Sequence, residues 1–535
     1  MLTDNIPFKD TGYFSKLICD YLDEKEDLKP FYSLFPSIEN FKSQIEEKQS
    51  SFKNENRVVL YDVLKKQYKG LNTSETTQQN IEALKQKHTF TITTGHQLNL
   101  FTGPLYFLFK IVSTINLTRE LKSAYPEYNF VPVYWMATED HDFDEINFFN
   151  FKGKKIQWNR DGSGAVGEFS NEGLDKVFDI FSKEIGQNLH AETLKQLFKD
   201  AYLDHDNLAE ATRFLANELF SNLGLVILDA NTKDLKREFI PFIEKELTEQ
   251  LSFKHVSETN KKINTLSNKE YSIQVNPREI NLFYLTKGLR ERIVYEDEKY
   301  KVLNTKFSWS KSEILKHVNK MPERFSPNVI LRPLYQEVVL PNLCYIGGGG
   351  ELAYWLQLKS NFVAHNVTFP ILLLRNSVLI KTKQQTEKLN KLNISSHDMF
   401  LKQDAFVNKR VRDISNIDID FTPQMEYLQK QFKELFILAE QTDKSFIGAV
   451  KAQEMKQLKG LKHLEKRLIR AQKRKLSEQV SRIVIIQDEL FPNKSLQERQ
   501  ANFSEFYLQH GELLIQQLVL NLQPLKAEFL ILNLD

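Results

Sequence analysis

Between residues 89 and 137 the chain carries a strand, a helix and a second strand in succession, and this unit constrains the fold more than any other feature. Thr89–Thr94 is rich in β-branched residues, and the helix-periodic apolar segment Leu105–Ser123 follows the turn residues Gly103 and Pro104. Phe130–Ala137 is almost continuously apolar, which is typical of a strand buried on both faces. Strands joined by a helix pair in parallel with a right-handed crossover. We therefore predict an α/β fold built on a parallel sheet.

Three more apolar runs can join this sheet, and the segments between them read as insertions. The runs are Gly224–Asp229, which a helix follows near Thr232, Leu343–Ile346 and Phe369–Leu374. A final helix is predicted over Ser495–Leu520. The expected division is an N-terminal helical part of the core (1–88), a first strand–helix–strand unit (89–150), a first insertion (151–223), a core strand and helix (224–250), a second insertion (251–325), the rest of the core with a glycine loop (326–420), an antiparallel coiled coil (421–492) and a C-terminal helical segment (493–535).

A change of pattern near residue 425 predicts an α-helical coiled-coil domain. Apolar residues recur at three-four spacing through Met425–Ala439 and again through Leu458–Ile483, and neither Gly nor Pro interrupts 461–491. We expect two long helices joined near Asp443 as an antiparallel hairpin. The second seam is longer than its hairpin partner can cover, and exposed apolar seams usually find a partner, so we predict a homodimer through the coiled coil.

Composition narrows the class of protein. Lys and Arg total 72 against 70 Asp and Glu, a net charge of +2 that provides no global basic field for nucleic acid. The two cysteines, Cys19 and Cys344, exclude a disulfide framework and suit a reducing compartment. Met1–Asp10 lacks the features of a signal peptide, and the apolar stretches are shorter than the roughly 18 residues that span a bilayer. We expect a soluble cytoplasmic protein whose partners are neither nucleic acid nor membrane.

The first candidate site lies where the first strand ends. Ligands of open parallel sheets bind at the carboxyl ends of the strands, and Gly95, His96, Gln97 and Asn99 occupy that position. His96 can donate a hydrogen bond to a phosphoryl or acyl oxygen, and the two amide side chains add polar contacts. The alternative is that His96 only caps the turn.

The second candidate site, Glu139–Glu145, places five carboxylates and one imidazole directly after a buried strand. His141, paired with Asp140 or Asp142, can act as a general base. The carboxylates can instead hold Mg²⁺, which prefers oxygen ligands. A metal-dependent hydrolase that binds Mn²⁺ or Zn²⁺ here is the alternative function, and a solvated acidic turn is the structural alternative.

The third candidate site follows Leu343–Ile346. Four successive glycines let backbone amides approach a ligand closely, and a helix begins at the acidic residue that follows them. The residues expected to contact a substrate are Gly347, Gly348, Gly350, Glu351 and Tyr354. A flexible connection is the alternative. Upstream, Arg332 can meet the same sheet edge and bind a carboxylate, or form a surface ion pair instead.

Two further patterns favour structural interpretations. Gly162, Gly164 and Gly167 match the spacing of a dinucleotide-binding loop, but no helix opens at the motif, which favours a glycine turn within an insertion. The basic segment Lys451–Arg482 can bind polyanions in a non-enzymatic scaffold, although charge runs on helices are more commonly solvated faces.

Four long segments resemble the BshC family, which is proposed to catalyse the cysteine-adding last step of bacillithiol biosynthesis. They are TTGHQLNLFTGPLYFLFK (Thr93–Lys110), VPVYWMATEDHDFDEIN (Val131–Asn147), FSPNVILRPLYQEVVLPNLCYIGGGGELAYW (Phe325–Trp355) and LQERQANF (Leu496–Phe503). The resemblance extends over essentially the whole chain. It implies a Rossmann-like core related to nucleotidylyltransferases, connecting-peptide insertions, a coiled-coil domain and a homodimer.

The resemblance also implies the reaction, which joins the carboxyl group of cysteine to the amine of glucosaminyl-malate. An amide bond of this kind requires an activated carboxyl group, so ATP or another adenine nucleotide and Mg²⁺ are candidate cofactors, while the energy source stays open. The candidate catalytic residues are His96, Asp140, His141 and Asp142. The candidate substrate-binding residues are Gly95, Gln97, Asn99, Lys110, Glu139, Arg332 and the glycine-loop residues named above, with Arg332 and Lys110 assigned to the malyl carboxylates.

Overall fold

The structure, a computed structural model, describes residues 3–266, 268 and 270–534. Its contacts divide the chain into two units, one formed by residues up to Ile380 together with Leu496–Leu534 and the other by Lys381–Ser495. Residues 381–420, which the sequence division assigned to the core, lie in the second unit. They do so because α19 (Gln403–Ile414) packs against the long helices of that unit, α21 (Lys444–Lys475) and α22 (Ser477–Leu490).

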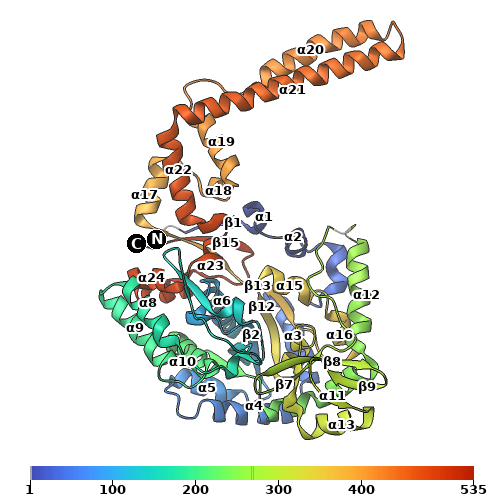
Figure 1. Ribbon diagram of the computed structural model, residues 1–535, viewed down its shortest axis with the longest axis vertical. Helices are drawn as coiled ribbons and strands as arrows, with labels where there is room; N and C mark the ends of the chain where they lie inside the picture. Colours follow the sequence, from blue (N-terminus) through green and yellow to red (C-terminus); the bar gives the residue numbers. More distant parts are fainter. Residues whose placement is uncertain (1–2, 267, 269, 535) are drawn as a thin grey trace. The chain divides into compact units, whose positions relative to one another are not determined.

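The core of the first unit is a five-stranded sheet, in which Figure 1 shows β2, β12 and β13 side by side. Its strands, in spatial order, are β13 (Ile371–Leu374), β12 (Asn342–Gly347), β2 (Thr89–His96), β3 (Asn129–Met136) and β6 (Val226–Asp229). Each neighbouring pair of strands is parallel. All five strands predicted from the sequence are therefore confirmed, as is the parallel sheet.

The order of the strands makes the sheet Rossmann-like. The chain starts in the centre at β2, runs outward through β3 and β6, and returns to the other side of β2 with β12 and β13. In the register, Thr93 of β2 pairs with Val133 on one side and Tyr345 on the other. The winding therefore reverses between β2 and β12, and open α/β sheets bind their ligands at such a reversal.

Helices of the core begin and end close to the positions that the sequence signals. α6 (Tyr106–Ala124) connects β2 to β3 and packs against both strands, and the Thr232 side chain caps α11 (Lys233–Glu249). The other core helices are α1 (Phe8–Thr11), α2 (Lys16–Leu22), α3 (Ile38–Ser51), α4 (Asn54–Gln67), α5 (Glu75–Ala83), α14 (Arg332–Val339), α15 (Gly349–Trp355) and α16 (Lys359–Ala364). In the described ranges no helix is both long enough and apolar enough to cross a membrane.

Two insertions interrupt the sheet. The first consists of the hairpin β4 (Phe148–Phe151) and β5 (Lys154–Gln157), followed by α8 (Leu174–Ile185), α9 (Leu189–Tyr202) and α10 (Leu208–Phe220). The second comprises α12 (Leu251–Leu266), α13 (Lys311–Lys320) and a five-stranded sheet of β7 (Leu282–Thr286), β8 (Leu289–Glu296), β9 (Lys299–Val302), β10 (Ser308–Trp309) and β11 (Phe325–Pro327). The neighbouring strands of this second sheet run antiparallel, so it is distinct from the core sheet.

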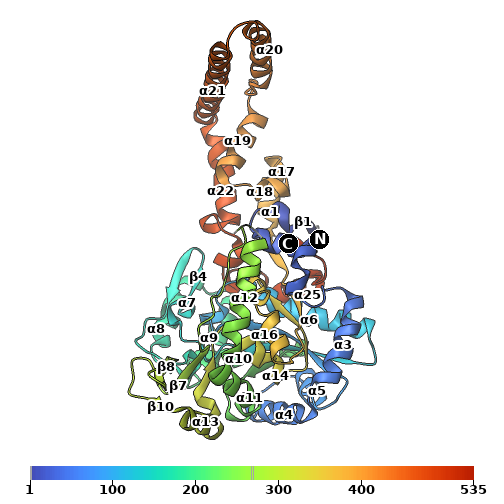
Figure 2. The ribbon, with the colours of Figure 1, turned by 90° about the vertical axis from the view of Figure 1, so that its right-hand side faces the viewer.

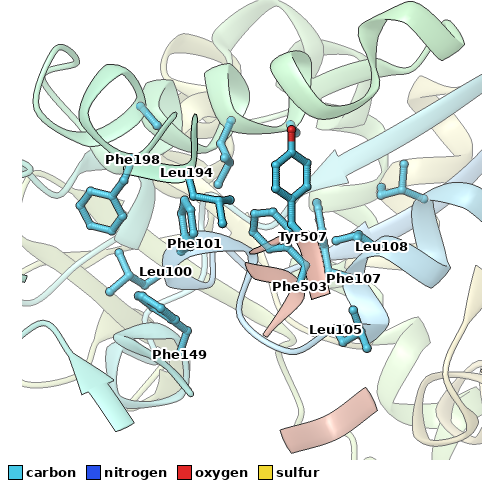
Figure 3. Close-up of a cluster of buried hydrophobic side chains, with 14 of the residues drawn as sticks. Leu100, Phe101, Leu105, Phe107, Leu108, Phe149, Leu194, Phe198, Phe503 and Tyr507 are labelled. Carbon is cyan, nitrogen blue, oxygen red and sulfur yellow. The ribbon is translucent and has the colours of Figure 1, made fainter. Parts of the chain in front are cut away.

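A large apolar cluster connects the first insertion with the end of the chain (Figure 3). Phe101, which follows β2, contacts Phe149 of β4, Phe198 of α9 and Phe503 of α24 (Phe503–His510), with ring centroids 5.1–5.5 Å apart. Such aromatic contacts bury much apolar surface at low entropic cost. The first insertion and the C-terminal segment therefore share one core with the strand–helix unit that carries His96.

The C-terminal segment corrects the prediction of one helix over Ser495–Leu520. The structure has three short helices there, α23 (Gln497–Gln500), α24 and α25 (Leu513–Asn521). The first break occurs because Asn502 caps α24, and the second because Gly511 adopts a φ of +57°. The sequence interpretation also missed β15 (Glu528–Leu534), which pairs antiparallel with β1 (Thr3–Pro7) and lies beside β14 (Ser377–Thr382).

The second unit contains the predicted coiled-coil hairpin. α20 (Thr422–Ala439) and α21 lie side by side in Figures 1 and 2, and Asp443 caps α21 by accepting hydrogen bonds from two backbone amides. Phe432, Ala439 and Val450 are buried between the two helices. The expected continuous helix through 461–491 instead breaks at Leu476, where α21 ends and α22 begins. α17 (Lys383–Lys391) and α18 (Ser396–Met399) complete this unit.

Candidate active site

A cleft of about 1010 Å³ opens at the carboxyl edge of the core sheet, where β2, β3 and β12 end. It brings together all three loops that the sequence singled out, because parallel strands deliver the loops that follow them to one edge. The sequence-predicted residues that line it are Gly95, His96, Gln97, Lys110, Glu139, Asp140, His141, Arg332, Gly348, Gly350, Glu351 and Tyr354. Three other predicted residues, Asn99, Asp142 and Gly347, do not line it.

These three residues have local roles instead. Asn99 is buried, and its amide donates to the Glu145 carbonyl at 3.2 Å. Asp142 is exposed and precedes the short helix α7 (Phe143–Ile146). Gly347 ends β12 in a tightly packed position, where a Cβ would lie 2.9 Å from the Leu352 side chain. Any larger residue at 347 would therefore force the glycine loop to move.

A buried ion pair fixes the glycine loop against the end of β2. The Lys110 ammonium lies 2.5 Å from the Glu351 carboxylate and donates to the Gly95 carbonyl at 2.8 Å. Glu351 also accepts hydrogen bonds from the Tyr345 hydroxyl at 2.7 Å and the Gly348 amide at 2.9 Å. Burial opposes ionisation of Glu351, but the charge of Lys110 and these donors outweigh it and lower its pKa. The charge of Lys110 is therefore already neutralised inside the protein.

His96 is neutral and carries a buried ring nitrogen without a partner in the described residues. Burial and the nearby charge of Lys110 lower its pKa to about 3. A hydrogen bond to the Thr102 backbone opposes that shift, which identifies the backbone partner as the carbonyl and the ring nitrogen that bonds it as a donor. Nε2 is buried and has no hydrogen-bond partner in the described part of the chain. In a neutral imidazole with a protonated Nδ1, Nε2 is an acceptor, so His96 carries an unsatisfied lone pair that the surrounding protein encloses.

His141 has the opposite hydrogen-bonding character. Its Nδ1 lies 2.8 Å from Nη1 of Arg290, and a guanidinium can only donate, so Nδ1 must accept. The neutral ring then carries its proton on Nε2. The ring also packs against Phe283 at 5.6 Å between centroids, and Arg290 lies over the same phenyl ring at 4.0 Å. His141 is therefore held as a hydrogen-bond donor.

Asp140 is held as an anion between these groups. Burial would raise its pKa, but the hydrogen bonds that it accepts from Gln97 and from the His141 backbone amide at 2.8 Å, together with the charge of Arg290, lower it well below the usual range. The Gln97 amide donates to Asp140 at 2.9 Å and to Glu145 at 2.8 Å. The loop after β2 and the loop after β3 are thus connected directly through Gln97.

Arg332 is half-buried at the opposite wall. Its guanidinium donates to Gln336 at 2.9 Å and lies over the rings of Tyr345 and Trp355, 5.6 and 5.9 Å from their centroids. In the described part of the chain, no carboxylate lies within ion-pair distance of Arg332. A half-buried guanidinium without an anion is suited to bind one from solution.

The sequence interpretation missed five cations of the cleft region. Arg278, Arg290, Arg375 and Arg499 line the cleft, and Lys236 lies behind the lining residue Glu139. Arg290 comes from the second insertion, and its position depends on tertiary packing that no local pattern signals. Lys236 of α11 is buried, pairs with Glu139 and donates to the Phe325 carbonyl at 2.9 Å. Arg375 follows β13, so the strand-end rule could have found it. It forms a buried two-bond ion pair with Glu498 at 2.6 and 3.1 Å.

The Gly162–Gly167 motif is a glycine turn that joins the two sides of the cleft. Gly164 has a φ of +100°, and a Cβ there would lie 2.9 Å from the Leu289 amide nitrogen of β8. The neighbouring Ser163 hydroxyl donates to the Gly288 carbonyl at 2.6 Å. At the other end of the motif, Gly167 donates to the Thr138 carbonyl at 2.9 Å. The motif therefore fastens the hairpin that carries Arg290 to the loop that carries Asp140.

The acidic cluster Glu139–Glu145 is arranged around cations of the protein itself. Among the residues that the structure describes, no group of three or more His, Cys, Asp or Glu side chains is placed to hold a metal ion. Glu139 is instead neutralised by Lys236, and Asp140 by its hydrogen-bond donors and the nearby Arg290. The geometry thus provides no ligand set for the metal-dependent hydrolase alternative.

The fold and the cleft define a Rossmann-like protein with a coiled-coil domain and a strand-end site of mixed charge. Residues 1–376 match the family model described as "Bacillithiol biosynthesis BshC, N-terminal Rossmann-like domain". Residues 378–534 match the model described as "Bacillithiol biosynthesis BshC, C-terminal coiled-coil domain". The chain belongs to the BshC family.

Curated relatives agree over the full length. A protein of Flavobacterium johnsoniae is 61% identical over 534 residues, which cover 100% of both chains. One of Christiangramia forsetii is 60% identical and covers 100% of this chain and 99% of its own, and one of Cytophaga hutchinsonii is 41% identical and covers 97% of each. All three carry the name "Putative cysteine ligase BshC".

Proposed function

We propose that this protein joins the carboxyl group of L-cysteine to the amine of glucosaminyl-malate, forming the amide bond of bacillithiol in the cleft at the sheet edge. The family and the names of the relatives support a cysteine ligase. The observation that carries the proposal is Arg332, a half-buried guanidinium facing the cleft without a carboxylate partner in the described residues. The malyl group offers carboxylates that match this fork. We also propose that the reaction takes place in the cytoplasm, where free thiols persist.

Lys110, the other cation assigned to the malyl carboxylates, has a different role in this proposal. Its ammonium already contacts Glu351 and the Gly95 carbonyl. A buried pair of this kind is costly to break, because either partner would remain as an uncompensated charge. We therefore assign substrate binding to Arg332, and to Lys110 the holding of the glycine loop against β2.

The three titratable groups of the cleft fit the amide-forming step. The amine nitrogen attacks the activated cysteine carbonyl carbon, a C–N bond forms, and the activating group leaves with its electron pair. The attacking nitrogen becomes acidic once the bond forms, so a weak acceptor suffices for its proton, and Asp140 is the acceptor that we assign at the cleft. His96 Nε2 is enclosed by the protein, so it can take this proton only if the loop around it opens. His141 Nε2–H can donate to the carbonyl oxygen as negative charge develops there. The exposed Asp142 takes no part in this proposal.

Activation of the cysteine carboxyl group requires a co-reactant, and we propose ATP with Mg²⁺. Arg278 and Arg499 support an anionic co-reactant, because both line the cleft and are exposed. Within the described ranges, neither has a carboxylate at ion-pair distance. Guanidinium groups bind phosphate oxygens well.

The test is a reconstitution with purified protein. Cysteine, glucosaminyl-malate, ATP and Mg²⁺ are incubated with the protein, and bacillithiol is followed by mass spectrometry together with ADP and AMP. We expect product only in the complete mixture, and the nucleotide product identifies an acyl phosphate or an adenylate. Formation of bacillithiol without ATP would refute the proposal that ATP activates the carboxyl group. Absence of bacillithiol with every nucleoside triphosphate tried would refute the proposed ligase activity.

A further inference from the structure

A buried polar chain leads away from Arg332 into the protein interior. Gln336 lies one turn after Arg332 on α14, is fully buried, and accepts the guanidinium hydrogen bond on Oε1 at 2.9 Å. The amide of the same side chain donates from Nε2 to the carboxylate of Glu337 at 3.0 Å. Gln336 thus connects the cleft to a carboxylate that the cleft itself does not reach.

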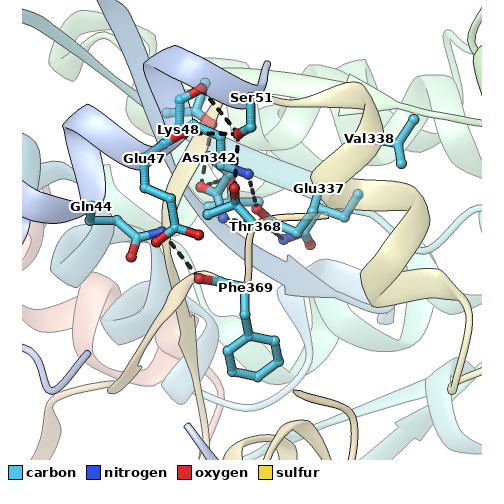
Figure 4. Close-up of polar contacts among 12 residues, drawn as sticks. Gln44, Glu47, Lys48, Ser51, Glu337, Val338, Asn342, Thr368 and Phe369 are labelled. Atoms are coloured by element: carbon cyan, nitrogen blue, oxygen red, sulfur yellow. Dashed lines mark hydrogen bonds and ion pairs between the residues drawn. The ribbon is translucent and has the colours of Figure 1, made fainter. Parts of the chain in front are cut away.

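Glu337 is the centre of a network of buried groups (Figure 4). Its second oxygen pairs with the Lys48 ammonium of α3 at 2.9 Å, and both side chains are at most 1% exposed. Its first oxygen also accepts from the Asn342 amide at 2.7 Å. Asn342 in turn accepts from the Thr93 hydroxyl of β2 at 2.8 Å. The network therefore anchors α14 to α3 and to the two strands at which the sheet reverses.

The bond from Arg332 to Gln336 has only one possible direction, because a guanidinium only donates. Burial raises the pKa of Glu337, while the Lys48 ammonium and the donors around it favour the ionised form, which only accepts. The Gln336 amide must therefore turn its oxygen toward Arg332 and its nitrogen toward Glu337, because the flipped amide would face donor to donor and acceptor to acceptor. Glu337 consequently fixes the orientation of Gln336, and Gln336 fixes that of the guanidinium.

The buried Lys48–Glu337 pair is not explained by stability alone. Removing two charges from water costs free energy that an apolar pair of similar volume would not, so a buried ion pair is weak evidence for stabilisation. None of the chemical roles proposed for the cleft uses these groups. Besides anchoring α14 to α3 and to the sheet, they reach one residue of the cleft, Arg332, through Gln336.

We infer that Gln336 is a positioning residue, which with Glu337 and Lys48 holds the Arg332 guanidinium in the orientation that receives a substrate carboxylate. The inference rests on the proposed function of Arg332. A carboxylate binds a guanidinium through two parallel hydrogen bonds, so the affinity depends on the plane in which the fork is held. Without Gln336, the guanidinium keeps its charge, its aromatic neighbours and a long hydrogen bond to the Tyr354 hydroxyl at 3.5 Å, but it loses the shorter hydrogen bond, at 2.9 Å, that holds its plane.

The test compares two identical substitutions in the same layer of the core. Gln336→Met removes the bond to Arg332, and Gln44→Met is the matched control, because Gln44 is equally buried and bonds only the Phe369 carbonyl. Binding of glucosaminyl-malate is measured by isothermal titration calorimetry, and KM and kcat by the reconstituted reaction. We expect Gln336→Met to raise both Kd and KM about ten-fold and to change kcat little. A ten-fold loss of affinity is about the size expected for one lost hydrogen bond to a charged group. Gln44→Met should bind as the wild type does.

Two further variants make the result decisive. In an Arg332→Met background, adding Gln336→Met should cost nothing more, because the two residues act through one guanidinium. Arg332→Lys keeps the charge without the fork and should lose at least as much affinity as Gln336→Met, which tests the orientation even if Gln336→Met does not fold. Wild-type affinity in Arg332→Met would refute the proposed role of Arg332. Loss in Arg332→Met with wild-type affinity in Gln336→Met or Arg332→Lys would overturn the inference alone.

Discussion

The two histidines of the cleft show how neighbouring groups decide the chemistry of a residue type. From the sequence, His96 is predicted to be a hydrogen-bond donor and His141 a general base. Both residues follow buried strands, and an imidazole can play either part, so the sequence alone cannot distinguish these roles. The structure gives each a partner that fixes its proton. His96 bonds a backbone carbonyl and leaves a free lone pair, whereas His141 accepts from Arg290 and leaves a free N–H. Sequence reasoning therefore located the residues, but only tertiary contacts indicate their roles.

The first prediction concerns Asp140 and His141. Asp140→Asn and His141→Ala should each lower the rate of bacillithiol formation by about 10² to 10³-fold, the size expected for a lost acceptor or oxyanion donor. Both side chains lie at the cleft rather than in the apolar core, so the melting temperature should change little. Rates are measured by mass spectrometry and folding by circular dichroism. Full activity of His141→Ala, or an unfolded variant, would show that the acidic loop is only a structural turn.

The second prediction concerns the buried thiol. Burial raises the pKa of Cys344 well above its usual value, and the side chain is fully enclosed in β12. A thiol that stays protonated and inaccessible is a poor nucleophile. Cys344→Ala should therefore keep most of the activity and lose about 1 to 2 kcal/mol of stability through the small cavity. A folded Cys344→Ala variant without turnover would instead indicate a thioester intermediate on this residue.

At the scale of elements, the sequence predicted what local patterns determine. β-branched residues identified the first strand of the core sheet and apolar runs the other four, and the strand-end rule then placed three separate loops in one cleft. Pairing between segments that are distant in the sequence produces no local pattern from which it could be predicted. β1 and β15 come from opposite ends of the chain, and the break of the long helix at Leu476 carries neither Gly nor Pro. Arg290 reaches His141 only because an insertion folds back over the sheet edge.

The third prediction concerns the glycine turn that connects that insertion to the site. Gly164→Ala puts a Cβ at a φ of +100° and 2.9 Å from the Leu289 nitrogen, so β8 must shift and carry Arg290 with it. Gly186→Ala is the matched control, since its φ is +89° but a Cβ there meets nothing within 4 Å. Both should lose roughly 1 kcal/mol of stability from the backbone conformation. Only Gly164→Ala should also lose activity, measured at a temperature where both variants are folded. Equal activities of the two variants would show that this turn does not position residues of the site.

At the scale of the whole molecule, the coiled-coil unit exposes more apolar surface than its own helices cover. Tyr427 and Leu438 of α20 are 67% and 54% exposed, and Phe446 and Leu464 of α21 are 45% and 53% exposed. Phe446 and Leu464 share one face of α21, because a whole number of turns separates them. By contrast, Leu468 packs against the buried cluster formed by α19 and α21, so it belongs to the unit's own core. Exposed apolar seams of this kind are typical of association sites.

The last prediction is therefore a homodimer formed through α20 and α21. Light scattering should give twice the mass of the chain for the wild type, and Leu438→Glu combined with Leu464→Glu should give the mass of one chain, because two charges would be buried in the shared seam without partners. Both positions are exposed within the unit, so the charges should leave its own fold intact. Leu520→Glu is the control, since Leu520 is 74% exposed on α25 in the other unit and should leave the dimer intact. A dimer that survives both seam charges would place the interface elsewhere on the molecule, and a monomeric wild type would leave these residues as solvated apolar surface.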